Sequence, residues 1–118
     1  MRVLICDDTE VIRKTMRMFL EKDGHEVVAD CSCGEEAIER YKLERPDVCL
    51  LDIAMPGMDG MTTMREIKSF APDVRVIMCT AKDDQKSIDQ AKELGVIDFV
   101  EKPFSPSRLR EAMAKVIL

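Results

Sequence analysis

Three aspartates stand directly after short apolar runs of the sequence. Asp7 and Asp8 follow VLIC at residues 3–6, and Asp52 follows VCLL at residues 48–51. Such runs predict strands buried on both faces, where an ionised carboxylate is costly. If the two strands are neighbours, each pair of carboxylates repels by about 1 kcal/mol in water and roughly 4 kcal/mol at an effective dielectric of 20. The three acids therefore need a partner of opposite charge.

A hard divalent cation would remove this conflict, because carboxylates, backbone carbonyls and water are the ligands that Mg²⁺ prefers. Asp8 and Asp52 would supply carboxylates, and Asp7 would hold a metal-bound water. The backbone carbonyl of Ala54 is a further candidate ligand. With the charge balanced, one carboxylate can attack a phosphoryl group and form an acyl phosphate. The pattern therefore predicts a Mg²⁺ site that supports phosphoryl transfer.

Further polar residues follow other apolar runs. Thr80 and Ala81 come after the fourth run, and Lys102 comes shortly after the fifth. The Lys102 ammonium can balance phosphoryl charge, and the Thr80 hydroxyl can hydrogen-bond a phosphoryl oxygen. The backbone amides of Ala54 and Ala81 are candidate donors to the same group. Each of these residues alone is more often structural, but their shared position after strands predicts one site.

Apolar runs and amphipathic stretches alternate along the whole chain. The strand candidates cover residues 3–6, 26–30, 48–51, 74–79 and 97–100. Apolar residues recur at helical spacing between these runs. Strands that alternate with helices indicate crossover connections and a parallel sheet covered on both faces. We therefore expect an α/β fold, three-layered and doubly wound, whose ligand site lies beyond the carboxyl ends of the strands.

The length and charge of the chain limit the function classes. A chain of 118 residues suits one domain, and its 18 basic and 23 acidic residues give a net charge of -5. This balance does not indicate a nucleic-acid surface. The first ten residues resemble neither a signal peptide nor a membrane span. We expect a single domain over residues 1–118, cytoplasmic and monomeric, that binds neither nucleic acid nor a membrane.

Sulfur-containing residues are frequent, with five cysteines and nine methionines. Cys31 and Cys33 form an isolated C-x-C pair, and His25 is the one histidine, so the chain lacks the donors of a zinc site. We expect structural roles for all the cysteines. Core filling is the first interpretation of four methionines spaced by three residues, and a soft partner-binding patch is the alternative. These methionines are Met55, Met58, Met61 and Met64.

The ordered motifs together resemble the receiver domain of two-component response regulators. They are DD at 7 and 8, D at 52 followed by MPGMDG, TA at 80 and 81, and KPF at 102–104. The resemblance spans the whole chain and implies a flavodoxin-like (βα)5 fold with strand order 2-1-3-4-5. It also implies one role for each motif residue: Asp52 as phosphoacceptor, Asp7 and Asp8 as the acid pair for Mg²⁺, Thr80 as the switch hydroxyl, and Lys102 as the cation that pairs with the phosphate.

The resemblance further implies a conformational switch. Phe99 falls where the family has its switch aromatic, and Thr80 would move toward the phosphoryl group while Phe99 turns inward. The output surface would comprise the helix containing residues 88–94, the strand at 97–100 and the helix containing 109–116. The expected partners are a histidine kinase or histidine phosphotransfer domain and a downstream target.

The leading functional hypothesis is a stand-alone signalling switch that catalyses only its own phosphorylation and dephosphorylation. Residues 73–85 and 98–109 look closer to the chemotaxis kind, which makes the flagellar motor switch the expected target. A phosphorelay intermediate is the alternative. A Mg²⁺-dependent phosphohydrolase that forms an aspartyl phosphate is disfavoured. Such an enzyme typically has a second acid two residues after the nucleophile, to act on the leaving group, and that position is Ala54 here. A flavin-binding electron carrier is disfavoured because Asp7 and Asp8 would repel a flavin phosphate. Ala54 and Lys82 flank the site, where polar side chains would affect the attacking water.

Overall fold

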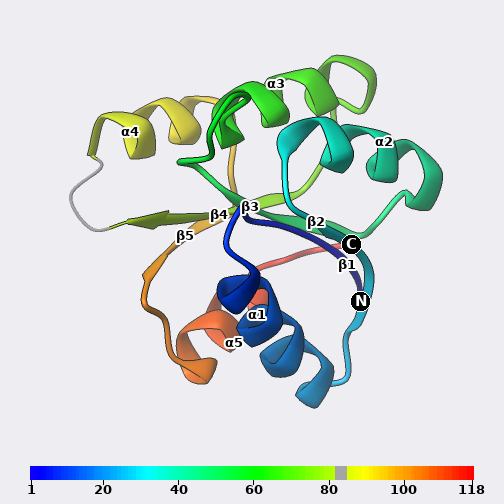
Figure 1. The fold of residues 1–118 in the computed structure, drawn as a ribbon, viewed down its shortest axis with the longest axis vertical. Helices are drawn as coiled ribbons and strands as arrows, with labels where there is room; N and C mark the ends of the chain where they lie inside the picture. The colour runs from blue at the N-terminus through cyan, green and yellow to red at the C-terminus, as the bar shows by residue number, and fades with distance from the viewer. Residues whose placement is uncertain (82–84) are drawn as a thin grey trace.

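Five strands and five helices alternate along the chain, as the hydrophobic pattern predicted (Figure 1). The computed structural model describes residues 1–81 and 85–118. The strands are β1 (Arg2–Cys6), β2 (Glu26–Cys31), β3 (Val48–Asp52), β4 (Val76–Ala81) and β5 (Asp98–Lys102). The helices are α1 (Glu10–Lys22), α2 (Gly34–Glu44), α3 (Gly60–Phe70), α4 (Gln85–Glu93) and α5 (Pro106–Ala114).

The strands form one parallel sheet in the order β2-β1-β3-β4-β5, which confirms the expected topology. β1 and β3 are therefore neighbours near the centre of the sheet. In their register Cys6 is the partner of Leu51, so Asp7 and Asp52 are the next residues at the ends of adjacent strands. The sheet order alone thus brings the predicted acids together.

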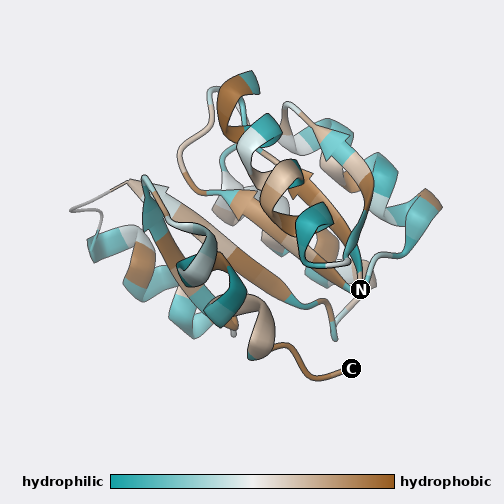
Figure 2. Cartoon of the chain, turned by 90° about the horizontal axis from the view of Figure 1, so that it is seen from below, coloured by the Kyte–Doolittle hydropathy of each residue, from teal (hydrophilic) through white to brown (hydrophobic). Residues whose placement is uncertain are grey.

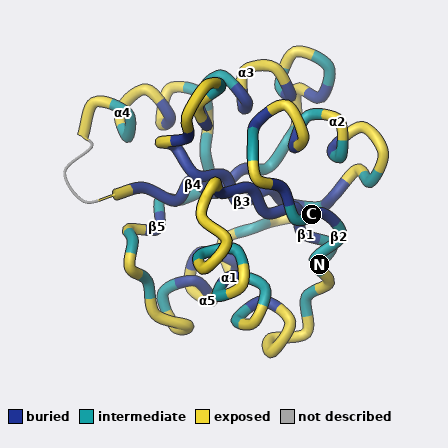
Figure 3. Tube along the Cα trace, viewed as in Figure 1, coloured by how far each residue is buried: buried dark blue, intermediate teal, exposed yellow. Residues whose placement is uncertain are grey.

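Helices cover both faces of the sheet, with α1 and α5 on one side and α2, α3 and α4 on the other (Figure 1). The central strands are dark blue in Figure 3, because their side chains are buried on both faces. They are also largely brown, hydrophobic, in Figure 2, between helices that carry teal, hydrophilic segments. Alternate strand residues enter two cores: Val3 and Ile5 pack toward α1 and α5, whereas Leu4 and Cys6 pack toward α2 and α3.

The strands differ from the predicted runs by one or two residues at their ends, and β4 and β5 each end two residues later than predicted, with a consequence for the site. β4 extends to Ala81 and β5 to Lys102, because Thr80 pairs with Glu101 and Ala81 with Lys102 in the parallel ladder. The apolar run in the sequence ends at the last apolar residue, whereas the backbone pairing of the strand continues past it. Thr80 and Lys102 are thus held by the sheet itself, while Lys82 lies outside the described residues.

Polar side chains cap the starts of two helices, α3 and α5. The Ser105 side chain accepts a hydrogen bond from the Arg108 backbone amide at 3.1 Å, and Pro106 begins α5. Asp59 caps α3 by accepting from the Thr62 amide at 2.8 Å. Across the described parts of the chain, no helix has the length and apolar character needed to cross a membrane.

Candidate functional site

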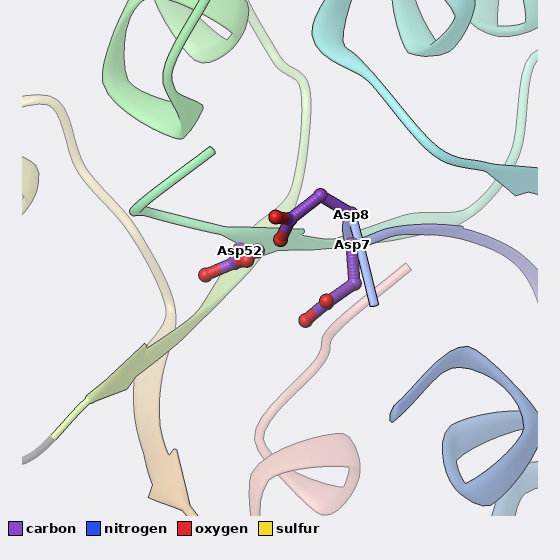
Figure 4. Close-up of side chains that lie close together, drawn as sticks. All are labelled: Asp7, Asp8 and Asp52. Carbon is purple, nitrogen blue, oxygen red and sulfur yellow. The ribbon is translucent and has the colours of Figure 1, made fainter. Parts of the chain in front are cut away.

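The predicted acids meet at the carboxyl end of the sheet (Figure 4). Asp7 and Asp8 follow β1, Asp52 ends β3, and one carboxylate oxygen from each lies within 4.8 Å of the others. Asp7 and Asp52 are buried, whereas Asp8 is exposed. The cluster therefore has two buried members and one that opens to solvent.

Lys102 reaches into this cluster from the end of β5. Its Nζ atom lies 2.6 Å from Asp7 Oδ2 and 3.0 Å from Asp52 Oδ1. Burial alone would lower the pKa of Lys102, but its hydrogen bonds to the two carboxylates outweigh this effect and raise it. Lys102 therefore stays charged and partly neutralises the buried acids.

The environment of Asp52 disfavours its ionised form. Burial raises the pKa of Asp52 to about 6, and the charge of Asp7 and side-chain hydrogen bonding with Asp8 act in the same direction. The hydrogen bond and positive charge of Lys102 oppose this shift without cancelling it. The backbone amide of Ala54 also donates to Asp52 Oδ1 at 3.2 Å. Asp52 is thus held by two donors yet carries a charge that the fold does not fully compensate.

Asp7 is fixed from several sides. Its Oδ1 atom accepts from the Thr9 amide at 2.8 Å, and its Oδ2 atom accepts from Lys102. Its backbone carbonyl accepts from the guanidinium of Arg13 at 2.8 Å, and Arg13 also pairs with Asp30 at 2.8 Å. Arg13 thereby ties the acidic loop to β2. The sequence gives no signal for this role, because a basic residue on the first turns of a helix normally faces solvent.

Gly60 is a second contributor that the sequence analysis missed. A β-carbon at Gly60 would overlap the Asp52 backbone carbonyl and would crowd Ile53. The Gly60 amide donates to the Ile53 carbonyl at 2.9 Å, which closes the loop after β3. Glycine therefore lets α3 begin directly against the end of β3. The motif MPGMDG contains this glycine, but only the close approach explains it.

The two predicted switch residues lie on neighbouring strands. Thr80 is buried, and its hydroxyl donates to the Ala81 carbonyl at 3.1 Å. Met78 pairs with Phe99, so by strand alternation Thr80 and Phe99 face the same side of the sheet, toward α3 and α4. Phe99 is half-buried, and the Lys92 ammonium lies 5.9 Å from its ring centroid. The Thr80 hydroxyl is therefore engaged with the backbone carbonyl of the next residue.

The donor set fits a hard divalent cation. The cluster of Asp7, Asp8 and Asp52 offers carboxylate oxygens only, and the exposed Asp8 leaves room for water ligands. Of the residues that the structure describes, these three form the one group of acids, histidines or cysteines that is close enough to hold an ion. Ligation by the Ala54 carbonyl stays a prediction.

Comparisons with known proteins agree with this geometry. Residues 3–114 match the response regulator receiver domain family. The chain is 41% identical over 116 residues to the chemotaxis protein CheY of Bacillus subtilis, covering 98% of this chain and 97% of the relative. It is 40% identical over 115 residues to CheY of Thermotoga maritima, covering 98% and 96%.

Solved structures are similar over the same range. The CheX–CheY–BeF3–Mg²⁺ complex from Borrelia burgdorferi matches with a TM-score of 0.93 at 29% identity, covering 99% of this chain and 89% of that one. A response regulator receiver domain protein from Clostridium thermocellum matches with a TM-score of 0.91 at 30% identity, covering 98% and 93%. The likeness therefore extends over the whole sheet and all the elements that position the site.

Proposed function

This chain belongs to the response regulator receiver domain family, a family of phosphoaccepting two-component switches, and we propose that Asp52 carries its phosphoryl group. The observation that supports this assignment is the set of donors around Asp52. The Lys102 ammonium and the Ala54 amide both reach its Oδ1 atom, at 3.0 and 3.2 Å. Asp7 faces Lys102 but has its other oxygen tied to the Thr9 amide. Asp52 is the acid best placed to act as nucleophile.

The reaction is phosphoryl transfer from a phosphohistidine donor. A bond forms between phosphorus and a carboxylate oxygen of Asp52 while the phosphorus–nitrogen bond of the donor breaks. The electron pair returns to the imidazole nitrogen, which takes up a proton. Hydrolysis resets the switch. A water molecule attacks phosphorus and the bond between phosphorus and the Asp52 oxygen breaks. Inorganic phosphate leaves, and the Asp52 carboxylate is restored.

The neighbouring residues balance charge during both steps. Mg²⁺ would be held by Asp8 and Asp52, and by Asp7 either directly or through water. When bound, it would supply positive charge next to the phosphoryl oxygens. Lys102 would exchange its contact with the Asp52 carboxylate for one with a phosphoryl oxygen. The amides of Ala54 and Ala81 and the hydroxyl of Thr80 would donate to the remaining oxygens.

The signal would leave the site through β4 and β5. Thr80 would give up its bond to the Ala81 carbonyl and turn toward the phosphoryl group, which would open space for the ring of Phe99. Phe99 lies on the edge strand β5, between α4 and α5, so its movement would alter the α4-β5-α5 surface. That surface is the proposed binding site for a downstream target.

The pathway proposed is chemotaxis, because two relatives, 41% and 40% identical to this chain, are named chemotaxis proteins. The phosphoryl donor would be a histidine kinase or histidine phosphotransfer domain, and the target would be a flagellar motor switch protein. The chain would act as a monomer of one domain, as a switch rather than an enzyme with an external substrate.

Labelling tests the phosphoacceptor. The protein is incubated with Mg²⁺ and acetyl phosphate, and its mass is measured before and after hydroxylamine, which cleaves acyl phosphates. We expect one phosphoryl group on the wild type and none on Asp52→Asn. The control Asp73→Asn changes an exposed aspartate and should label like the wild type. Equal labelling of Asp52→Asn would refute the assignment.

A further inference from the structure

Arg108, in the first turn of α5, holds the backbone of the proposed switch aromatic. Its guanidinium donates to the Phe99 backbone carbonyl at 2.6 Å and to Asp98 Oδ2 at 3.0 Å. The Asp98 carboxylate in turn accepts from the Phe99 backbone amide at 2.8 Å, through its Oδ1 atom. The Asp98–Arg108 pair therefore takes up both backbone polar groups of Phe99 and joins them to α5.

Phe99 lies on an edge of the sheet, where its backbone is open to contact from outside. β5 is the last strand in the order β2-β1-β3-β4-β5, so only one of its sides pairs with β4. On the other side of an edge strand, amides and carbonyls need partners other than a strand. At Phe99 these partners are the side chains of the Asp98–Arg108 pair. The position of this backbone therefore depends on α5 as well as on the sheet.

Charge strengthens the contact within the pair. The Asp98 side chain is 12% exposed and that of Arg108 is 32% exposed, so water screens the pair only in part. Burial alone would raise the pKa of Asp98, but hydrogen bonds from Arg108 and Lys115 outweigh this effect and lower it. Asp98 therefore stays ionised, and charge-assisted hydrogen bonds are shorter and stronger than neutral ones. The pair is a firm link between β5 and α5.

An arginine on an edge carbonyl can also serve stability alone. At the opposite edge of the sheet, Arg40 of α2 donates to the Val28 carbonyl of β2 at 2.9 Å. The difference lies in the residue that is held. Phe99 shares its side of the sheet with Thr80 on the adjacent strand, whereas β2 is separated from β4 by two strands. Arg40 is therefore the comparison for a purely structural contact.

Phe99 is also linked to α4, but through its ring. The Lys92 ammonium lies 5.9 Å from the ring centroid. An inward turn of the ring would break this contact, because Lys92 is exposed at the surface. The backbone bonds to the Asp98–Arg108 pair do not involve the ring and would survive the turn. The pair is thus a connection between Phe99 and a helix that persists in both positions of the ring.

We propose that Arg108 is a positioning residue of the switch, which transmits the movement of Phe99 to α5 through the Phe99 backbone. This inference rests on the proposed function, because it takes Phe99 as the residue that responds to a phosphoryl group on Asp52. When the ring turns inward, the adjoining backbone of β5 adjusts, and Arg108 carries that adjustment to α5. Without Arg108 the ring would still respond, but α5 would not.

The test follows the ring and α5 separately in the full-length protein. Beryllofluoride, a phosphoryl analogue, is added with Mg²⁺ to protein that carries an amide isotope label and para-fluorophenylalanine. The fluorine signal of Phe99, assigned with Phe99→Tyr, reports the ring, and the amide signals of Ala112 and Met113 report α5. In the wild type both sets of signals should shift. In Arg108→Met the fluorine signal should still shift, and the shift of the two amide signals should be lost.

A second variant keeps the charge. Arg108→Lys retains a cation beside Asp98, but lysine lacks the planar fork that reaches two acceptors at once. It should therefore lose the α5 shift as well. The fluorine shift shows that each variant is folded and binds beryllofluoride, so a structural failure is not mistaken for a lost connection.

Two control variants remove other arginines. Arg40→Met removes the matched bond at the β2 edge, and Arg110→Met removes an exposed arginine of α5 that pairs with Asp23 at 3.1 Å. Both should keep the fluorine and amide shifts of the wild type.

The outcomes separate this inference from the proposed function. The inference is wrong if an Arg108 variant that still shifts the fluorine signal also keeps the α5 shift. It is also wrong if Arg40→Met loses the α5 shift, or if the wild type shifts the fluorine signal alone. A wild type whose fluorine signal does not respond to beryllofluoride would contradict the proposed function itself, and with it this inference.

Discussion

Asp52 should reduce the stability of the metal-free protein at neutral pH. Its pKa is raised from 3.8 to about 6, with burial as the main cause, so folding at neutral pH forces a charge into a site that disfavours it. A difference of about 2.2 pKa units corresponds to about 3 kcal/mol. The variant Asp52→Asn keeps the shape of the side chain and has no charge to bury. We expect it to be more stable than the wild type by up to about 3 kcal/mol at pH 7.5.

The stability difference between Asp52→Asn and the wild type should depend on pH. Because the folded state binds the Asp52 proton more tightly than the unfolded state, acidification stabilises the wild type as the pH falls from about 7 to about 4. The advantage of Asp52→Asn should therefore shrink to about half at pH 5, and below pH 3.8 it should disappear. The pKa of about 6 already includes the opposing ion pair with Lys102 at 3.0 Å, so about 3 kcal/mol is the net effect of burying the Asp52 charge.

Urea denaturation in EDTA, followed by circular dichroism at pH 7.5 and pH 5, measures both differences. Asp73→Asn is the matched control, because it removes the same charge from an exposed position and should change stability by less than about 0.5 kcal/mol. The reasoning fails if Asp52→Asn is no more stable than the wild type at pH 7.5. It also fails if the difference between them does not decrease at pH 5.

Three other substitutions test how the site is held together. Lys102→Met should lower stability by about 3 kcal/mol in urea denaturation, because it leaves the buried carboxylates of Asp7 and Asp52 without their cation; an unchanged midpoint would contradict the ion-pair geometry. Gly60→Ala should cost about 1–3 kcal/mol through overlap with the Asp52 carbonyl, and a neutral effect would show that α3 can shift at no cost. Arg13→Gln should weaken Mg²⁺ binding, measured by calorimetry, by several-fold through a looser Asp7 loop, while Lys14→Gln, an exposed neighbour, should leave it unchanged.

The sequence predicted the sheet well because strand signals are local. Each central strand is a short run of apolar residues, and parallel strands buried on both faces need only that pattern. The acids after β1 and β3 were identified for the same reason, since the end of an apolar run marks the edge of the sheet. The predicted ends of β4 and β5 were less accurate, because Thr80 and Lys102 are polar residues that still pair in the parallel ladder.

The sequence by itself thus determined the order of elements, the position of Asp7, Asp8 and Asp52 at strand ends, and the need for a balancing cation. The sequence also placed Lys102 in the site, as a partner of the phosphoryl group. The tertiary structure alone showed that Lys102, 95 residues from Asp7, pairs directly with the buried Asp7 carboxylate at 2.6 Å. It likewise decided that Gly60 must lack a side chain. These features depend on contacts between distant elements, and such contacts are set by strand register and helix packing rather than by local residue pattern.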